Sequence, residues 1–328
     1  MTDQAQQRQS KERKAFTASD AEWMYHGGEY VRMSDVRLSP ATHGLNYGTG
    51  VFEGIRAYWN EQKETLQVLK LREHYERFEQ SCKLLRIELP HTVDELCEIT
   101  CEILRRNAPR EDTYIRPLAY KSATAIGVKL ALDAELSIFT VPMGNYVELT
   151  GLKCAVSSWR RTSDNAIPAR AKLTGSYLNT ALAVDDAQRV GYDDAIFLTE
   201  DGQVSEASAA NIFIVRKGRL STPSGTADIL EGITRDAVMD LTRRELDIPV
   251  VARDIDRTEL YAADEVFLTG TGFQIAPVVE IDGREIGDGT VGPVAERLQE
   301  LYFRAARGEN PDYADWTVAV DVANGPQG

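Results

Sequence analysis

A break in the pattern of strands and helices near the middle of the chain most constrains the fold. The segment SIFTVPMGNYVELTG, residues 137–151, begins as a strand-like run, passes through Pro142 and Gly144, and becomes strand-like again. Proline lacks an amide hydrogen and glycine is conformationally permissive, so both interrupt regular elements. We therefore place a domain boundary here. The length of 328 residues agrees with two domains of roughly 150 residues each.

The first half of the chain combines hairpin-like sequence with two helical patterns. A pair of glycines at residues 27–28 predicts a turn between short strands. In residues 72–86, apolar side chains recur at spacings of three and four, which places them on one face of a helix. A second helix is predicted to begin after Thr92, because Thr92 and Glu95 have the spacing of a capping box.

The second half alternates strands and helices. Short runs rich in Ile, Val, Leu and Phe, bounded by turn residues, predict strands, and apolar residues at spacings of three and four predict helices. The mixture indicates an α+β fold in two domains. The predicted strands are residues 194–199, 212–215, 219–221 and 265–270, and the predicted helices are residues 177–189, 233–246 and 294–306.

The ends of the chain complete the expected domain organisation. The first nineteen residues are polar and lack the apolar run of a secretory signal, which predicts a flexible tail. No stretch reaches the roughly 18 consecutive apolar residues of a membrane span. We expect the tail at 1–20, a small domain at 21–141, an interdomain loop at 142–150 and a large domain at 151–328.

Charge and cysteine content exclude several kinds of partner. Asp and Glu number 51 and Lys and Arg 37, which gives a formal net charge of −14. Nucleic-acid binding depends on clustered Lys and Arg, so neither nucleic acid nor an acidic membrane is an expected partner. An anionic ligand has to meet a locally positive pocket, because the long-range field repels it.

The four cysteines and four histidines show no metal-binding pattern. No CxxC spacing occurs, and no paired histidines accompany the cysteines. Cys97 and Cys101 lie one helical turn apart, which fits two small buried side chains better than metal ligands. We therefore expect no metal and a reducing, cytoplasmic setting.

Three glycine-containing segments are candidates for ligand binding. The run at residues 41–58 interleaves glycines with aromatic side chains, and its backbone can either approach a ligand closely or form a tight hairpin. Residues 232–234 begin a predicted helix, where free amides and the helix dipole can bind phosphate; an ordinary N-cap at Thr234 is the alternative. The tripeptide at 270–272 follows a predicted strand and is either a second anion-binding nest or a simple turn.

Two ionisable residues stand out because small residues surround them. Lys172 lies in the segment ARAKLTGSY, away from any run of charges, and a lysine in such a setting can act as a nucleophile toward carbonyl groups. Glu206 lies in VSEASAANIF, before a predicted strand, where it is either a turn or cap residue or a catalytic partner. The residues alone leave both interpretations open.

Together these segments resemble the class IV aminotransferases, which use pyridoxal phosphate, and within them the branched-chain amino acid aminotransferases. The resemblance runs from about Trp23 to Val320. It implies fold type IV: a small N-terminal α/β domain and a larger C-terminal domain with a barrel-like sheet flanked by helices. The most specific motifs are Glu206-x-Ser208-x-x-Asn211-Ile212-Phe213, Leu220-x-Thr222 and Leu230-x-Gly232-Ile233-x-Arg235.

The resemblance implies pyridoxal phosphate as the cofactor and assigns residues to it. Lys172 would bind the cofactor covalently and move the proton between substrate and cofactor. Glu206 would face the pyridine nitrogen and keep it protonated. The other cofactor residues implied are Arg77, Ile233, Thr234 and Thr271 around the phosphate and Tyr177 at the 3′ oxygen.

The same resemblance implies a pocket that accepts both branched-chain side chains and glutamate. Tyr114 and the amides near Thr271 and Gly272 would bind the α-carboxylate. Arg116 would receive the distal carboxylate of glutamate. The walls and further pocket residues implied are Tyr47, Phe52, Arg56, Tyr146 and Tyr177.

Two positions depart from the typical family pattern. Met143 stands where typical members have tryptophan, and Gly272-Phe273 stands where they have two small residues. A flexible thioether in place of an indole is expected to loosen one wall of the pocket. The range of substrates is therefore expected to differ, whereas the cofactor residues are unchanged.

We therefore expect a transaminase that exchanges amino groups between L-leucine, L-isoleucine or L-valine and 2-oxoglutarate in a ping-pong cycle. The resemblance implies a homodimer or an assembly of dimers, in which the loop at 126–128 closes the neighbour's site. A D-amino acid or (R)-amine aminotransferase and an aminodeoxychorismate lyase are alternatives on the same fold. A phosphate-binding regulatory protein is a further alternative, although it would not need Lys172, Glu206 and Tyr177 together.

Overall fold

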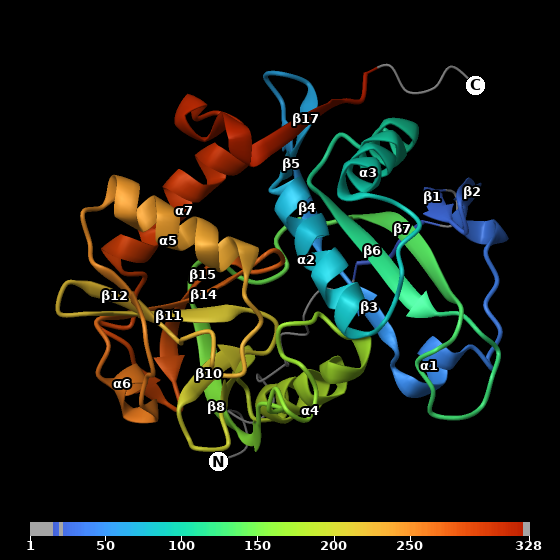
Figure 1. The fold of residues 1–328 in the computed structure, drawn as a ribbon. Helices are drawn as coiled ribbons and strands as arrows, with labels where there is room; N and C mark the ends of the chain where they lie inside the picture. Colours follow the sequence, from blue (N-terminus) through green and yellow to red (C-terminus); the bar gives the residue numbers. More distant parts are fainter. Residues whose placement is uncertain (1–15, 20–21, 324–328) are drawn as a thin grey trace, which may run out of the picture. The chain divides into compact units, whose positions relative to one another are not determined.

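The computed structural model describes residues 16–19 and 22–323, and the chain divides into two compact units (Figure 1). The N-terminal unit comprises the described residues up to Gly144, the segment Ala171–Ser176 and the chain from Phe303 onward. The C-terminal unit comprises Asn145–Arg170 and Tyr177–Tyr302. Each unit contains its own sheet, which confirms the expected mixed α+β architecture.

The division differs from the expected domain ranges in two segments. Residues 171–176 and the chain from Phe303 onward belong to the N-terminal unit, although both lie inside the range 151–328 expected for the large domain. Long-range pairing explains the difference, because Leu173 forms a β-bridge with Val51 and Thr317–Asp321 pairs with Thr65–Leu69. Lys172 is consequently carried by the N-terminal unit. The expected tail lies mostly outside the described residues.

The N-terminal unit is built on an antiparallel sheet with strand order β17-β5-β4-β6-β7-β1-β2, and β3 pairs with β6. β1 and β2 form the hairpin predicted at residues 27–28. The strands are β1 (Trp23–His26), β2 (Glu29–Arg32), β3 (Gly50–Phe52), β4 (Ile55–Asn60), β5 (Thr65–Leu69), β6 (Thr113–Lys121), β7 (Ala134–Pro142) and β17 (Thr317–Asp321).

The helices of this unit follow the sequence patterns closely. α2 (Leu71–Leu84) buries Tyr75, Phe78 and Cys82 on one face, as the spacing predicts. α3 (Val93–Asn107) begins with the predicted capping box, in which the Thr92 amide donates to Glu95 Oε2 at 2.7 Å. α2 and α3 pack against each other. The shorter helices are α1 (His43–Tyr47), η1 (Met33–Asp35), η2 (Thr174–Ser176) and η3 (Pro311–Trp316).

The C-terminal unit is built on a mixed sheet with strand order β10-β9-β8-β15-β14-β11-β12-β13, and β16 pairs with β15. β8 runs parallel to β9 and β15, and β12 runs parallel to β13. The strands are β8 (Leu152–Arg160), β9 (Asp194–Leu198), β10 (Val204–Ala207), β11 (Asn211–Arg216), β12 (Arg219–Thr222), β13 (Val250–Ala252), β14 (Glu265–Gly270), β15 (Gln274–Ile281) and β16 (Arg284–Glu285).

Helices of the C-terminal unit pack on this sheet through small and apolar faces. Ala183 and Ala187 of α4 contact Ala195 and Phe197 of β9. Among the described residues, no helix is both long and apolar enough to cross a membrane. The helices are α4 (Tyr177–Arg189), α5 (Ile233–Glu245), α6 (Arg257–Tyr261) and α7 (Pro293–Ala306), whose start lies in this unit.

Candidate active site

Lys172 is held by backbone hydrogen bonds from two directions within the N-terminal unit. Its amide donates to Ser81 Oγ at 3.3 Å, and its carbonyl accepts from the Phe52 amide at 3.0 Å. Ser81 belongs to a polar face of α2 that also carries His74 and Arg77, because residues three and four apart lie on the same side of a helix. The fold therefore places Lys172 next to α2 and β3.

Glu53, directly after β3, organises the polar face of α2. Its carboxylate is fully buried and accepts from Arg77 Nε at 2.7 Å, Arg77 Nη2 at 2.9 Å and His74 Nδ1 at 2.9 Å. The bidentate pairing fixes the plane of the Arg77 guanidinium group. Burial raises the pKa of the Glu53 carboxyl, but the charge of Arg77 and the hydrogen bonds from His74 and Arg77 outweigh burial and hold this pKa well below its usual range.

His74 is the member of this cluster whose neutral form is favoured by burial. Burial lowers the pKa of His74, the Glu53 carboxylate opposes that effect, and the positive charges of Arg77 and Lys172 add to it. A neutral imidazole with its proton on Nδ1 donates to Glu53 in this arrangement. The cluster therefore buries one carboxylate against one guanidinium group, with Lys172 close enough to contribute to the local field.

An aromatic wall next to Lys172 is formed by Phe52 and Tyr114. Lys172 Nζ lies 5.2 Å from the centroid of the Phe52 ring, and Arg116 Cζ lies 4.4 Å from the same centroid. Tyr114 and Arg116 are two residues apart on β6, so they share one face of the strand. A Cβ at Gly54 would overlap the hydroxyl group of Tyr114, so this position requires glycine.

Arg56 is almost completely buried, and its hydrogen bonds go to backbone carbonyl groups. Its Nη2 donates to the carbonyl of Met143 at 2.9 Å and to that of Gly144 at 2.7 Å. Its Nε and Nη1 have no hydrogen-bond partner among the residues that the structure describes. Arg56 thus fixes the chain that leaves β7, including Met143, the position at which the resemblance implies a tryptophan.

Tyr47 contacts the loop that the resemblance places at a neighbouring site. Its hydroxyl group accepts from the Gly127 amide at 3.1 Å, and His43 Nε2 lies 3.0 Å from the Gly127 carbonyl oxygen. Ile126 and Val128, on either side of this glycine, are 79% and 88% exposed. α1 therefore holds both backbone groups of Gly127 while two large apolar side chains point away from the core.

Glu206 is a buried carboxylate of the C-terminal unit that pairs with an arginine. Its Oε1 lies 2.7 Å from Arg161 Nη2, and its Oε2 accepts from Asn211 Nδ2 and from the Leu230 amide, each at 3.1 Å. Asn211 Nδ2 also donates to the Leu230 carbonyl at 2.9 Å.

The N-terminus of α5 lies beside this carboxylate network. Gly232, not Thr234, occupies the N-cap position, which corrects the alternative of an ordinary Thr234 cap. A Cβ at residue 232 would overlap Asn211 Oδ1, so tight packing against Asn211 selects glycine here. A glycine N-cap provides no side-chain acceptor, and the amides of Ile233 and Thr234 remain suited to an anionic ligand such as phosphate.

The turn between β14 and β15 carries Thr271 and Gly272. Tyr146 packs over it, because a Cβ at Gly272 would lie 3.4 Å from Tyr146 Cδ1. The rings of Tyr146 and Phe273 are 5.7 Å apart in an edge-to-face arrangement, and Phe273 is buried in the core of the sheet. Tyr177 is the first residue of α4, as predicted.

The expected site residues therefore fall into two sets, one in each unit. The N-terminal unit brings together Lys172, Arg77, Phe52, Tyr114 and Arg116, while Arg56 and Tyr47 hold neighbouring backbone. The C-terminal unit connects Glu206 to the start of α5 through Asn211, and it brings Tyr146 onto Gly272.

The sequence patterns did not predict that several residues of these two sets belong to the site. His74 and Ser81 lie on the α2 face that carries Arg77, and their spacing of three and four residues from Arg77 was the available signal. Little in the sequence indicated Glu53 or Arg161. A buried carboxylate requires a cation as its partner, but the sequence does not identify which arginine pairs with which carboxylate.

Comparison with known proteins adds an independent result. Residues 50–281 match the model of the amino-transferase class IV family. A probable branched-chain-amino-acid aminotransferase from Aquifex aeolicus is 47% identical over 301 residues, which cover 91% of this chain and 97% of that protein.

Solved structures of two similar proteins show the same fold. The branched-chain aminotransferase of Thermoproteus uzoniensis, solved with norvaline, has a TM-score of 0.87 and 42% identity and covers 91% of this chain and 99% of that one. A second branched-chain amino acid aminotransferase, complexed with N-(5′-phosphopyridoxyl)-L-glutamate, has a TM-score of 0.86 and 41% identity, with coverage of 91% and 98%. The chain belongs to the class IV aminotransferase family and has its fold.

Proposed function

We propose that the protein is a pyridoxal-phosphate-dependent transaminase that exchanges amino groups between L-leucine, L-isoleucine or L-valine and 2-oxoglutarate. The observation that carries this proposal is the setting of Lys172, whose backbone is bonded to α2 and β3 and whose Nζ lies over Phe52 near Arg77. The relatives and solved structures described above, which are branched-chain aminotransferases by name, support the choice of substrate.

The donor groups of the two sets suit pyridoxal phosphate. Its phosphate dianion needs a cation and oriented amides, which Arg77 and the amides of Ile233 and Thr234 supply, and the Thr271 hydroxyl adds a further donor. When bound, the cofactor supplies an electron sink for the charge left on the substrate Cα after it loses a proton. One of the two similar enzymes was solved with a phosphopyridoxyl derivative of glutamate, which supports this cofactor.

The roles of the remaining polar residues follow from their chemistry. With the cofactor bound, Lys172 Nζ would be the group that moves the proton between substrate and cofactor, so one residue would serve both transfers. Glu206 would face the pyridine nitrogen and favour its protonated form, and Arg161 Nη2, 2.7 Å from Glu206 Oε1, would hold the carboxylate in position. Tyr177 donates a hydrogen bond to the 3′ oxygen.

The substrate pocket is proposed to combine apolar walls with one positively charged side chain, that of Arg116. The resemblance assigns Phe52, Tyr47 and Tyr146 to the walls for a branched side chain. It assigns Tyr114 and the amides of Thr271 and Gly272 to the α-carboxylate. Arg116 binds the distal carboxylate of glutamate. With leucine bound, Arg116 keeps its contacts with the rings of Phe52 and Tyr114, 4.4 and 5.1 Å from their centroids, so its charge is not left unsatisfied.

Arg56 shapes this pocket through the backbone. Its bonds to the carbonyls of Met143 and Gly144 hold the chain where the thioether of Met143 replaces an indole. A shorter, flexible side chain leaves more room at this wall, and we infer a wider range of apolar side chains than in enzymes with tryptophan there.

Assembly and location are proposed on separate grounds. The exposed side chains of Ile126 and Val128 favour a homodimer in which this loop covers the neighbouring protomer's pocket. Sedimentation should give the mass of a dimer or a multiple of it; a fully active monomer would refute this assembly.

The four cysteines of the chain are free thiols, which supports a cytoplasmic location.

Replacement of the lysine tests the proposed function. In Lys172→Ala, transamination of L-leucine should fall by at least about a thousandfold, because both covalent attachment and proton transfer are lost. The visible absorption of the bound cofactor should disappear, while the circular dichroism of the fold remains. Lys153→Ala, at an exposed lysine paired with Glu280, is the matched control and should retain activity. Wild-type turnover by Lys172→Ala would show that the lysine assignment is wrong.

A further inference from the structure

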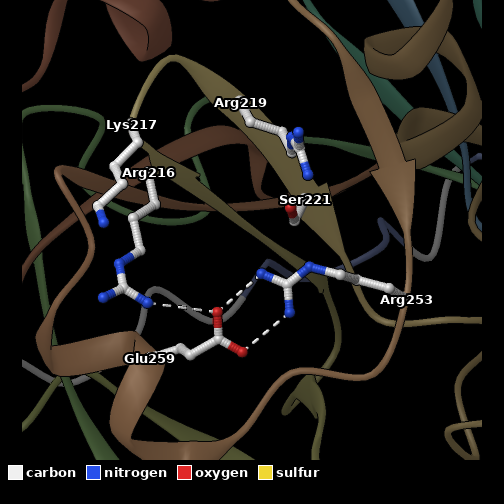
Figure 2. Close-up of a pocket in the computed structure, with 6 residues that line it drawn as sticks. All are labelled: Arg216, Lys217, Arg219, Ser221, Arg253 and Glu259. Atoms are coloured by element: carbon white, nitrogen blue, oxygen red, sulfur yellow. Dashed lines mark hydrogen bonds and ion pairs between the residues drawn. The ribbon is translucent and has the colours of Figure 1, made fainter.

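A concave pocket of about 310 Å³ lies at the edge of the C-terminal sheet, formed by the turn between β11 and β12, the chain after β13, and α6 (Figure 2). It is separate from the residues assigned to the cofactor. β11 begins at Asn211, which bonds Glu206, and ends at Arg216 in the pocket, so about 16 Å of extended strand separates them. The lining consists of four cations, one carboxylate and one hydroxyl: Arg216, Lys217, Arg219, Arg253, Glu259 and Ser221.

The carboxylate of this pocket is already paired. Arg253 donates to both oxygens of Glu259, from Nη1 at 2.8 Å and from Nη2 at 2.7 Å. Figure 2 shows that Arg216 approaches the same carboxylate from another side. Its Nη1 lies 3.6 Å from Oε2. Hydrogen bonds from Arg253 lower the pKa of Glu259, so it stays ionised. One negative charge is thus shared by two arginines.

The other two cations are not balanced. The side chains of Lys217 and Arg219 form no ion pair within 4.0 Å with a carboxylate in the part of the chain that the structure describes. Asp264 lies next to the turn, but the bond it accepts comes from the backbone amide of Lys217, at 2.7 Å. The pocket therefore has a net positive charge in a protein whose formal net charge is −14.

A buried hydroxyl group lies at the same place. Arg219 and Ser221 are two residues apart on β12 and share one face of the strand, while Leu220 between them is buried in the core. Ser221 is 2% exposed and lines the pocket. Its hydroxyl group can donate and accept hydrogen bonds at the wall of the pocket.

We propose that this pocket binds a small anion that carries a phosphoryl group. Planar guanidinium groups and a serine hydroxyl match the oxygens of a phosphate dianion, and Lys217 and Arg219 supply the uncompensated charge. Because the molecule as a whole repels anions, the attraction is local to the pocket. The volume of about 310 Å³ accommodates free phosphate or a small phosphate ester.

The test measures binding to the holoenzyme at saturating cofactor, so that the proposed cofactor phosphate site is filled. Titration calorimetry at low salt uses inorganic phosphate in one arm and glycerol 3-phosphate in the other. Saturable binding of either at one site per chain is expected. Tighter binding of glycerol 3-phosphate would identify an ester as the preferred source of the phosphoryl group, and equal binding would identify the free ion.

Two charge-matched variants decide where the anion binds. Lys217→Gln with Arg219→Gln should weaken binding at least about tenfold, because two charge-assisted contacts are lost, and Ser221→Ala should weaken it severalfold. Lys153→Gln with Arg284→Gln removes two charges elsewhere on the same unit and should change the affinity less than twofold. Absence of saturable binding, or equal losses in the two double variants, would overturn the proposal.

Discussion

At the scale of residues, each unit buries one carboxylate against one arginine. Glu53 pairs with Arg77 in the N-terminal unit, and Glu206 pairs with Arg161 in the C-terminal unit. Removing one member of such a pair leaves an uncompensated charge in a site that water reaches poorly, which costs more than the pair itself contributes. In the proposed site, Arg77 would therefore meet the cofactor phosphate as a donor already oriented by Glu53, with its charge partly balanced.

Neutralising Glu53 should affect both cofactor binding and stability. In Glu53→Gln, Arg77 loses its ionised partner, so we expect cofactor affinity to fall about tenfold or more and the free energy of unfolding to fall by about 3–5 kcal/mol. Equilibrium dialysis and denaturant unfolding measure the two effects. Glu76→Gln, on the exposed face of the same helix, should change stability by less than about 0.5 kcal/mol. Equal behaviour of the two variants would contradict this role for Glu53.

The same pair predicts how stability depends on pH. The folded-state pKa of Glu53 is below its unfolded value, so its contribution is present above the unfolded pKa of about 4.3 and is lost as pH falls below it. The difference in unfolding free energy between wild type and Glu53→Gln should therefore be largest above about pH 5 and shrink toward pH 3. A difference that does not change over this range would be inconsistent with an ionised Glu53 in the fold.

Residue identities were predictable where a motif specifies them, and pairings were not. Lys172 and Glu206 stand out in their local sequence, whereas the partner of each buried carboxylate depends on contacts across the fold. Glu53 and Arg77 lie 24 positions apart, and no periodicity relates them. The orphaned donors of Arg56 likewise follow from tertiary packing and leave no mark in the sequence.

At the scale of elements, local pattern predicted the helices and the hairpin at residues 27–28, but it carried no information on the pairing of distant strands. α4 begins and ends at the predicted residues, and α5 ends one residue before its predicted end, because the 3.6-residue period and the flanking glycines are local signals. The parallel pairing of β8 with β9 and β15 joins distant segments. The assignment of residues 171–176 to the N-terminal unit has the same origin, since it depends on the bridge between Val51 and Leu173.

The N-terminus of α5 provides a prediction at this scale. In Gly232→Ala, the added Cβ must displace Asn211, which bonds both Glu206 and the Leu230 carbonyl. We expect cofactor affinity to fall about tenfold and stability to fall by about 1–3 kcal/mol through strain. Gly225→Ala is the control, because its Cβ meets the flexible end of Glu231. Unchanged cofactor affinity in Gly232→Ala would show that the N-terminus of α5 does not bind the cofactor.

At the scale of the whole molecule, the formal net charge of −14 opposes the approach of anionic substrates. Salt screens this repulsion, because the Debye length shrinks to about 8 Å at physiological ionic strength. We expect kcat/KM for 2-oxoglutarate, a dianion, to rise about twofold or more between 10 and 150 mM salt. The value for zwitterionic L-leucine should stay nearly constant. A fall with salt for 2-oxoglutarate would mean that the local arginines, not the overall charge, control its approach.

The central claim, that this chain is an L-branched-chain amino acid transaminase, is tested most directly by a single half-reaction. Purified holoenzyme is mixed separately with L-leucine, D-alanine and (R)-1-phenylethylamine, without any 2-oxo acid, and the absorption of the bound cofactor is followed. The proposed site predicts rapid conversion of the cofactor to its amine form by L-leucine and much slower conversion by the other two. Failure of L-leucine to convert the cofactor, with conversion by D-alanine or the amine, would contradict the proposed activity.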